Sequence, residues 1–395
     1  MQLLNNVQHK LKIAQVIDVF EDSTNGGAIS TQRFTKLLRK EGHRVLVLST
    51  GKEAKDKIVL KEFYFPLAYL KRVMQRMKFV FAKPDKPLFQ KLFAKVDVVH
   101  NQFPLWLGIV AVGIAKRMNI PIVSTYHVQG EQLMHNSGLK HPFFIKLTYK
   151  CFMHFIYNKS DIVICPSEFA QQEILRYGCA SKTVVISNGV TDDYQPMDVP
   201  KRYPDKFTIL TVGRNALEKR QELLIRAVAA SKFKEQIQLV ILGDGPLRNK
   251  LETLSNELLD GKVEFQLLPT NKVVEYYNAC DLYVHAANVE VECMTALEAM
   301  ACGLPLLIAD APLSATKQFA LNDKFLFKTV SELTNKIDYW FENRAELAQA
   351  KEDYLALSAQ YHIDLSYEKL IQTYHLALAM HEQKEVQHVG RLQEA

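Results

Sequence analysis

The sequence lacks most of the patterns that mark a metal-binding, secreted or membrane-spanning protein. Its six cysteines are scattered singly with no C-x-x-C pair, which argues against a zinc or dithiol centre and fits reduced thiols in a cytosol. The segment from Met1 to Lys12 has no apolar core, so we expect no signal peptide. The longest apolar run, Phe103 to Ala115, is too short to cross a bilayer and predicts a core helix. No Asp-x-Asp motif is present, and we predict no metal requirement.

Length and composition indicate a folded protein with two domains. The chain has 395 residues, of which 48% are hydrophobic and 23% charged, as is typical of globular proteins. Residues 1–200 carry 27 Lys or Arg and 16 Asp or Glu, whereas residues 201–395 carry 22 and 27. A basic first half suggests a polyanionic partner, either a membrane surface or nucleic acid, although uneven solvation would give the same imbalance.

Apolar runs alternate with helical patterns along the chain, which predicts a parallel α/β sheet in each half. In the first half the expected strands are residues 12–20, 44–49, 96–100, 120–124, 161–165 and 183–186. In the second half they are residues 207–212, 238–242, 263–267, 282–287 and 306–309. A linker rich in Asp and Pro, residues 192–205, separates the two sets. The expected domains are residues 1–195 and 206–365, followed by a C-terminal helix and tail over residues 366–395.

Two cations stand where the first strand of the second half gives way to a helix. Arg214 and Lys219 follow the expected strand 207–212. Amides at a helix N-terminus attract anions, and an Arg fork or a Lys ammonium can join them in neutralising a diphosphate. After the next strand, the glycines Gly243 and Gly245 allow the backbone to approach a ligand closely.

Two glutamates, Glu290 and Glu298, flank the start of a small-residue helix that stops before Gly303 and Pro305. The loop and first turn of such a strand–helix–strand unit are where parallel sheets bind ligands. A carboxylate there can accept hydrogen bonds from ribose or sugar hydroxyls. Burial of Glu298 among Ala, Met and Leu is costly unless the acid has a partner. Capping or solvated surface acids would show the same spacing.

A histidine and a glycine pair are the candidates in the first half. His127 lies just beyond the carboxyl end of the expected strand 120–124, where the mouth of a binding cleft is found in such sheets. A lone histidine is more often structural, and His100, at another strand end, is a weaker candidate. Gly26 and Gly27 form a turn before a helix. Because no G-x-G-x-x-G is present, a dinucleotide site of the Rossmann type is not supported.

Two basic segments of the first half are interleaved with aromatic residues. Residues 71–95 hold eight Lys or Arg and one acid, and no acid occurs between Glu131 and Asp161. Basic residues among large apolar ones suit an anionic membrane surface, where each contributes roughly 1 kcal/mol. The residues expected to contact the membrane are Lys71, Arg72, Arg76, Lys78, Lys83, Lys146 and Lys150. Solvated lysines over core aromatics are the alternative, and no helix-turn-helix or zinc-finger pattern supports nucleic acid.

The phrase DLYVHAANVEVECMTALEAMACGLPLLIAD, residues 281–310, resembles the donor-site signature of family 4 retaining glycosyltransferases, which have the two-domain GT-B architecture. Glu292, Cys293 and Met294 stand where Phe-Gly-Leu is usual in that family. Other phrases similar to the family's are Ser-Thr-x-His, Asn-Gly-Val, Gly-Arg with Glu-Lys, and Gly-Asp-Gly-Pro, in that order. The resemblance covers roughly residues 12–310. It implies an α/β fold of two Rossmann-like, doubly wound parallel-sheet domains facing a cleft, with the C-terminal helix crossing back to the first domain.

The resemblance also implies a role for each candidate residue. The residues implied to act in catalysis are His127, Arg214, Lys219 and Glu290. Those implied to bind the donor are Gly26, Gly27, Arg214, Lys219, Gly243, Gly245, Glu290 and Glu298. The two cations would neutralise the leaving diphosphate, the two glutamates would hold the sugar and ribose hydroxyls, and closure of the domains would exclude water. The nucleotide-sugar is a substrate, so no cofactor is expected.

The wording Glu-Val-Glu-x-Met-x-x-Leu-Glu and the basic first half are similar to diacylglycerol glucosyltransferases. We therefore predict a cytoplasmic hexosyltransferase, peripherally associated with the cytoplasmic face of the membrane, that moves glucose from UDP-glucose to a lipid such as diacylglycerol. The expected partners are the nucleotide-sugar donor, an anionic membrane surface and the lipid acceptor. The alternatives are a glycosyltransferase with a soluble or polysaccharide acceptor, and a non-catalytic nucleotide-sugar or membrane-binding module. Intact Arg214, Lys219 and Glu298 argue against the non-catalytic module.

Overall fold

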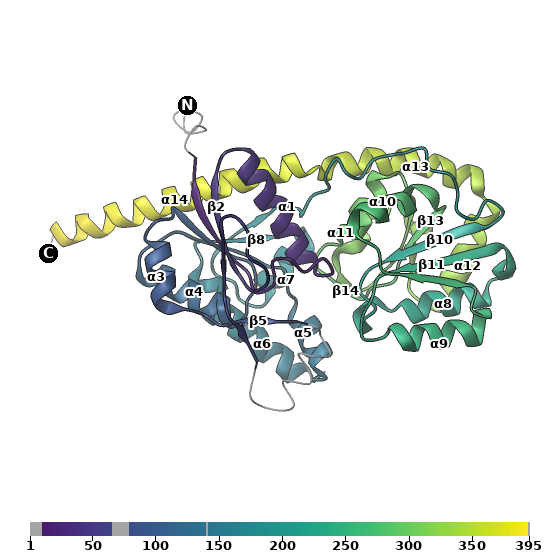
Figure 1. The fold of residues 1–395 in the computed structure, drawn as a ribbon, viewed down its shortest axis with the longest axis horizontal. Helices are drawn as coiled ribbons and strands as arrows, with labels where there is room; N and C mark the ends of the chain where they lie inside the picture. The colour runs from purple at the N-terminus through teal and green to yellow at the C-terminus, as the bar shows by residue number, and fades with distance from the viewer. Residues whose placement is uncertain (1–9, 65–78, 140, 394–395) are drawn as a thin grey trace. The chain divides into compact units, whose positions relative to one another are not determined.

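The computed structural model describes residues 10–64, 79–139 and 141–393 of the chain (Figure 1). By compactness the chain divides into two units, which are Met1–Ile186 with Tyr367–Ala395, and Ser187–Ser366. The second unit begins before the expected linker, because Asn188 and Val190 form hydrogen bonds to residues of that unit. The last helix, α14 (Ile363–Gln393), belongs to the first unit from Tyr367 onward.

A seven-stranded sheet forms the centre of the first unit, in the order β3-β2-β1-β6-β7-β8-β9, with every neighbouring pair parallel. Its strands are β1 (Lys12–Val16), β2 (Arg44–Ser49), β3 (Lys57–Val59), β6 (Val98–Asn101), β7 (Ile122–Thr125), β8 (Ile162–Cys165) and β9 (Lys182–Val185). The central strands β6, β7 and β8 are buried at every residue, as expected for a parallel sheet covered on both faces. A small antiparallel pair joins β4 (Glu62–Phe63) to β5 (Phe81–Ala82).

The helices of the first unit follow the expected alternation with strands. They are α1 (Gly26–Lys40), α3 (Lys86–Phe93), α4 (Trp106–Arg117), α5 (Gly130–Ser137), α6 (Pro142–Phe155) and α7 (Glu168–Arg176). Gly26 and Gly27 are the first residues of α1 instead of a turn that precedes it. The cause is Asn25, whose side chain caps the helix by accepting a hydrogen bond from the Ala28 N–H at 3.1 Å.

His100 is a structural residue of the first unit. Its Nδ1 lies 2.8 Å from the Tyr374 hydroxyl on α14, and its Nε2 lies 2.8 Å from the Thr125 hydroxyl. Burial lowers the pKa of His100 to about 3, so the ring is neutral at physiological pH. One ring nitrogen therefore contacts α14 and the other contacts the neighbouring strand β7, so both are engaged within the first unit.

The second unit is built on a six-stranded parallel sheet in the order β12-β11-β10-β13-β15-β17. Its strands are β10 (Phe207–Val212), β11 (Ile237–Leu242), β12 (Val263–Gln266), β13 (Leu282–His285), β15 (Leu306–Ala309) and β17 (Leu326–Phe327). Figure 1 shows α8, α9 and α12 on one face of this sheet and α10, α11 and α13 on the other. These helices are α8 (Gln221–Ala230), α9 (Arg248–Leu259), α10 (Thr270–Ala279), α11 (Met294–Ala301), α12 (Val330–Glu342) and α13 (Arg344–Ser358).

Both sheets share one topology, and that topology locates the binding edges. The strand order reverses between β1 and β6 in the first unit and between β10 and β13 in the second. Ligands of open parallel sheets bind outside the carboxyl ends of the strands at this reversal. The α/β class with a parallel sheet in each of two units is confirmed.

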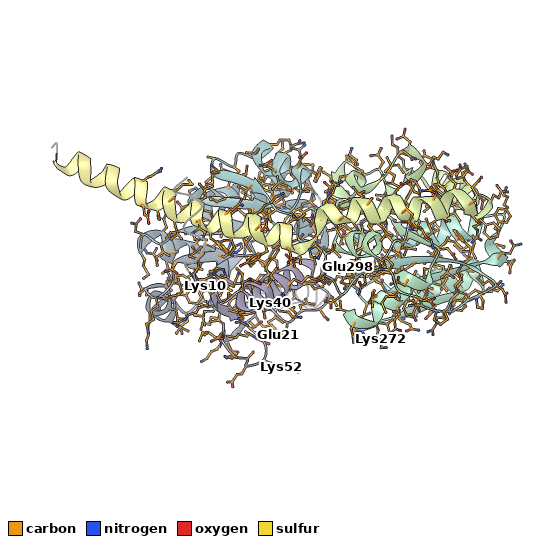
Figure 2. All side chains as sticks on the ribbon, turned by 90° about the horizontal axis from the view of Figure 1, so that it is seen from above. Lys10, Glu21, Lys40, Lys52, Lys272 and Glu298 are labelled. Atoms are coloured by element: carbon orange, nitrogen blue, oxygen red, sulfur yellow. The ribbon has the colours of Figure 1, made fainter. Side chains whose placement is uncertain are left out.

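Charged side chains lie on the surface of each unit, whereas the candidate donor-binding residue Glu298 of the second unit is buried. In Figure 2 the exposed side chains of Lys52 and Lys272 extend outward from the first and second units, respectively, whereas Glu298 is only 5% exposed. Among the described residues, no helix combines the length and apolarity needed to span a membrane.

The central strand β10 predicts where a core substitution would be costly. Leu210 has no exposed surface, so Leu210→Ala should lower the free energy of unfolding of the second unit by about 2–5 kcal/mol, through lost burial and a cavity. Urea unfolding followed by circular dichroism measures this change. Leu267, which is 60% exposed, supplies the matched control, and Leu267→Ala should change stability by less than about 0.5 kcal/mol. Equal losses in the two variants would contradict the assigned core.

Candidate active site

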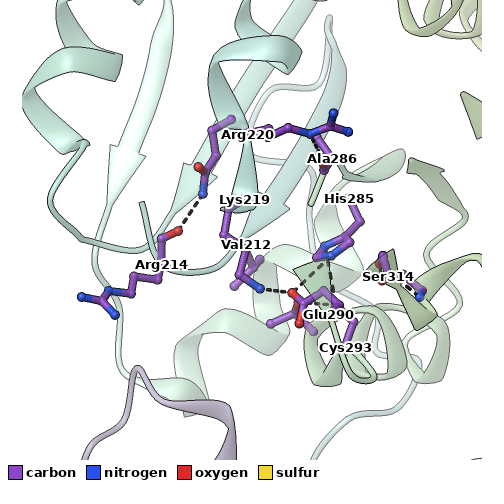
Figure 3. A network of polar contacts seen from close by, with 12 residues as sticks. Val212, Arg214, Lys219, Arg220, His285, Ala286, Glu290, Cys293 and Ser314 are labelled. Atoms are coloured by element: carbon purple, nitrogen blue, oxygen red, sulfur yellow. Dashed lines mark hydrogen bonds and ion pairs between the residues drawn. The ribbon is translucent and has the colours of Figure 1, made fainter. Parts of the chain in front are cut away.

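A partly buried ion pair between Lys219 and Glu290 occupies the carboxyl edge of the second sheet, where its strand order reverses. Lys219 ends a single 3-10 turn, Leu217–Lys219, that follows β10. Glu290 lies in β14 (Val289–Glu290), a two-residue strand held parallel to β16 (Leu313–Ser314). The Lys219 ammonium donates a hydrogen bond to Glu290 Oε1, as Figure 3 shows. Two residues that lie 71 positions apart in the sequence are thus joined at the expected edge.

Each member of the pair keeps the other charged. Burial raises the pKa of the Glu290 carboxyl, but the Lys219 ammonium and then His285 outweigh it and lower that pKa to about 2. Burial likewise disfavours the Lys219 ammonium, yet the Glu290 carboxylate raises the pKa of Lys219 above its ordinary value. The side chains are 20% and 15% exposed, so the pair remains partly open to a ligand.

Two residues not chosen from the sequence, His285 and Cys293, complete this network. His285 Nε2 lies 3.4 Å from Glu290 Oε1, and its Nδ1 lies 3.5 Å from the Cys293 sulfur (Figure 3). Burial lowers the pKa of His285, but the Cys293 thiol and the Glu290 carboxylate raise it to about 9 overall. The imidazole is therefore charged at neutral pH. His285 is the last residue of β13. Its position at the carboxyl end of a strand, the feature that made His127 a candidate, would also have identified it from the sequence.

Three side chains of this network, His285, Glu290 and Cys293, are of types that bind metal ions. The ligand atoms of His285, Glu290 and Cys293 all lie within 4.8 Å of one another. The Lys219 ammonium already occupies the carboxylate, and the imidazole uses opposite nitrogens toward the other two side chains. The Nδ1 of His285 faces Cys293 and its Nε2 faces Glu290, so one metal ion cannot take the place of both contacts. The arrangement fits an ion-pair network better than a metal centre.

The glycines of the predicted donor loop are required by packing between two backbones. Gly243 has φ +138°, and a Cβ placed on it would lie 2.0 Å from the Gly213 carbonyl oxygen. A Cβ on Gly245 would lie 2.5 Å from the Asn215 carbonyl oxygen. The loop after β11 therefore packs directly against the loop after β10, which carries Arg214 and Lys219. These contacts involve protein backbone and do not test the ligand contacts expected of the glycines.

Arg214 and Glu298 lie in the same unit but make different contacts. In Figure 3 the Arg214 guanidinium points away from the Lys219–Glu290 pair. The Arg214 carbonyl accepts a hydrogen bond from Gln221 Nε2 at 2.9 Å, which ties its loop to α8. Glu298 lies in α11 and accepts a hydrogen bond from the Tyr277 hydroxyl at 3.0 Å, which is the partner that a buried acid requires.

Glu292 is a second buried acid of the Glu290 loop. Its Oε2 accepts hydrogen bonds from Asn188, both from the backbone N–H at 2.9 Å and from Nδ2 at 2.7 Å. Burial raises the pKa of the Glu292 carboxyl to about 7, although the bonds from Ser187 and Asn188 oppose the shift. No local sequence pattern indicates this contact, because its partners lie 104 positions apart.

In the first unit the structure brings His127 close to Gly27, at the start of α1. A Cβ on Gly27 would lie 3.2 Å from His127 Cγ and 2.7 Å from Phe103 Cε1, so only glycine fits between the helix and these rings. His127 Nε2 lies 3.2 Å from Gln102 Oε1. Burial lowers the pKa of His127 to about 4, so its imidazole is neutral at physiological pH.

The predicted membrane residues divide into two groups. Lys71, Arg72, Arg76 and Lys78 lie outside the described residues. Lys83, Lys146 and Lys150 are exposed. The last two belong to α6, whose outer surface also exposes large apolar side chains. We name this surface the α6 face and define it as Phe143, Phe144, Lys146, Leu147 and Lys150; its apolar members are 60%, 36% and 45% exposed, respectively.

Comparisons with known proteins agree with this architecture. A family model described as Glycosyltransferase Family 4 matches residues 24–194, and one described as Glycosyl transferases group 1 matches residues 196–354. The chain is a family 4-like glycosyltransferase of the GT-B type. It is therefore an enzyme of the glycosyltransferase class, as the sequence predicted.

Individual relatives of this glycosyltransferase differ in what their names say they act on. An alpha-monoglucosyldiacylglycerol synthase of Streptococcus pneumoniae is 25% identical over 326 residues, which cover 76% of this chain and 72% of the relative. A GDP-mannose-dependent alpha-mannosyltransferase of Mycobacterium tuberculosis is 24% identical over 317 residues, covering 76% and 79%. The crystal structure of HepE from Anabaena in complex with UDP and glucose shares the fold, with a TM-score of 0.73 and 18% identity over 92% of this chain and 99% of that one.

The network predicts an unusual titration of His285. In the wild type the imidazole should titrate near pH 9, and Glu290→Gln should lower its pKa by about one unit or more, because the carboxylate that stabilises the imidazolium is removed. NMR titration of histidine Cε1–H signals, assigned with His285→Gln, measures both values. Glu298→Gln is the control, because Glu298 bonds to Tyr277 and should leave the midpoint unchanged. A midpoint that is the same in the wild type and Glu290→Gln would contradict the network.

Proposed function

We propose that this glycosyltransferase transfers a hexosyl group, with retention of configuration, from a nucleotide-sugar bound at the carboxyl edge of the second sheet. The observation that carries the proposal is the partly buried Lys219–Glu290 pair at the reversal of strand order. This edge is where parallel sheets bind ligands. The likeness of the fold to a UDP-bound structure supports a donor of this class, and UDP-glucose is the donor we propose.

The chemistry follows from the charges of the network. Negative charge grows on the diphosphate as the sugar leaves, so a cation already held in place stabilises the transition state more than the ground state. Glu290 holds the Lys219 ammonium charged and oriented before any donor arrives. In the proposed roles Lys219 and Arg214 contact the diphosphate, Glu298 the ribose, and Glu290 the sugar hydroxyls. Gly243 and Gly245 shape the loop beside them.

The neutral imidazole of His127 suits a different task. A ring that carries no charge at physiological pH can donate or accept a hydrogen bond to a sugar hydroxyl without attracting the diphosphate. We propose that His127 contacts the donor sugar, with Gly26 and Gly27 next to it at the start of α1. No metal ion or cofactor enters this scheme, and turnover should persist in the presence of a chelator.

The proposed acceptor is a membrane lipid such as diacylglycerol, reached from the cytoplasmic face. The α6 face supports this choice, because it exposes three large apolar side chains beside two lysines on one helix. Such a surface gains free energy both from burying apolar area among lipid headgroups and from attraction to anionic lipid. A soluble or polysaccharide acceptor would make no use of this surface.

Turnover measurements test the reaction. We expect nucleoside diphosphate release from UDP-glucose with anionic liposomes that contain diacylglycerol, and little release without lipid, within a panel of UDP-, GDP- and ADP-sugars. Lys219→Ala should lower kcat by about 10²–10³-fold, because one preorganised charge is lost at the leaving group. The control Lys272→Ala removes an exposed lysine of α10 that pairs with Glu275, and should have no effect. Unchanged turnover in Lys219→Ala, or turnover indifferent to lipid, would refute the corresponding part of the proposal.

Liposome binding tests the α6 face separately. The double variant Phe143→Ser/Leu147→Ser should weaken sedimentation with anionic vesicles by about tenfold or more, because the apolar part of the contact is lost. Release of nucleoside diphosphate with a water-soluble acceptor analogue should be retained. Leu175 on α7 is 47% exposed, so Leu175→Ser is a matched control that should bind like the wild type. Equal vesicle binding by the double variant and the wild type would exclude this face.

A further inference from the structure

Glu292 is held in a way that adds little stability but fixes its position. The side chain is 1% exposed, and one oxygen, Oε2, receives both donors of Asn188. The other oxygen, Oε1, has no hydrogen-bond partner among the described residues. A buried carboxylate that is only half satisfied is generally no more stabilising than an apolar side chain of similar size. Two hydrogen bonds to one oxygen do, however, restrain where the side chain can lie.

Asn188 lies where the chain passes from the first unit to the second. Ser187 is the first residue of the second unit, and the chain returns to the first unit at Tyr367. The two segments that join the units are hydrogen-bonded to each other within the second unit. The Val190 N–H donates to the Tyr361 carbonyl, and the Ile363 N–H donates to the Val190 carbonyl, each at 2.9 Å. Such joining segments absorb the backbone rotation when two domains move.

A close backbone contact reinforces this pairing. Gly189 has φ +71°, and a Cβ on it would lie 2.8 Å from the Ile363 Cα. The outgoing and returning segments therefore touch without an intervening side chain. Glu292 bonds to the residue immediately before this contact. Glu292 is thus hydrogen-bonded to the place where the two joining segments contact each other.

The loop that carries Glu292 is anchored by three of its side chains. Glu290 bonds to Lys219, Cys293 contacts His285, and Glu292 bonds to Asn188. Cys293 adopts φ 158° and ψ 92°, a backbone conformation that residues with a Cβ rarely adopt. Such a conformation persists only where the surroundings determine it. Release of one anchor should therefore let the whole loop relax.

We propose that Glu292 is a positioning residue that ties the loop bearing Glu290 to the segment joining the two units. The inference rests on the proposed function, because Glu290 is the assumed contact of the donor sugar. Rotation of the joining segment would move Asn188, and through Glu292 it would move Glu290 relative to Lys219. Donor contact and domain movement are then coupled through one side chain that itself touches no donor.

The test compares variants that break the tether in different ways. Glu292→Leu removes both acceptor oxygens, and Asn188→Ala removes the side-chain donor. Glu292→Gln keeps an oxygen of the same reach and serves as the conservative rescue. Asp281→Asn is the matched control, because Asp281 is also a buried carboxylate that accepts a backbone N–H, from Thr208 at 2.9 Å, but it directly precedes β13 at the opposite edge of the sheet.

Two measurements separate this proposal from the proposed function. The first is the NMR titration of His285 without any donor, in which loosening of the loop should lower the midpoint from about 9 in Glu292→Leu and Asn188→Ala but not in Asp281→Asn. The second is donor kinetics, in which Glu292→Leu should lower kcat/KM by about 10–100-fold, with Glu292→Gln close to the wild type. The double variant Asn188→Ala/Glu292→Leu should be no worse than Glu292→Leu, because both changes break one link.

The outcomes are distinct. Wild-type titration and kinetics in both Glu292→Leu and Asn188→Ala would overturn the positioning role. A kinetic loss equal to that of Asp281→Asn would also overturn it, since general destabilisation would then explain the effect. A wild-type enzyme that turns over no donor would refute the proposed function, yet the titration would still decide whether Glu292 holds the loop.

Discussion

The Lys219–Glu290 ion pair is the interaction on which the candidate site depends. It joins a single 3-10 turn to a two-residue strand, and neither element has enough internal hydrogen bonds to hold its own position. Removing either partner would leave a buried charge without compensation, which costs more free energy than the pair contributes. The pair therefore acts as a geometric constraint. Glu290 keeps the Lys219 ammonium charged, so the pair presents a fixed cation that suits an anionic ligand.

The glycines after β11 show that one sequence motif can have two structural reasons. Gly243 and Gly245 were expected to let a ligand approach the backbone. In the structure they let one loop approach another, with the Gly213 and Asn215 carbonyls where side chains would otherwise lie. That packing fixes the position of the loop that carries Arg214 and Lys219. A ligand role and a packing role both demand the absence of a Cβ, so the sequence pattern alone cannot separate them.

Much of the architecture was predictable because it is encoded locally. The buried strands β6, β7 and β8 are short apolar runs between turn residues, and such runs carry their own signal. A Gly-Gly pair predicts a turn, yet α1 begins at Gly26, because the Asn25 side chain caps the helix there. The pairing of β14 with β16 was missed, since two residues show no periodicity. The contact between Asn188 and Glu292 spans 104 positions, and no local pattern reports it.

The distribution of charge suggests why the polar site needs so many internal contacts. The half of the chain that carries the Lys219 site is acidic overall, with 27 Asp or Glu against 22 Lys or Arg in residues 201–395. At 0.1 M salt, exposed charges more than about 10 Å from an approaching donor are largely screened. Binding must therefore rely on positive charge that is concentrated and partly desolvated at one edge, where screening is weaker. Burial provides that concentration, but it also disfavours the charged form of Lys219, and the Glu290 carboxylate offsets this by raising the pKa of Lys219. The carboxylate is thus part of the electropositive site, although its own charge is negative.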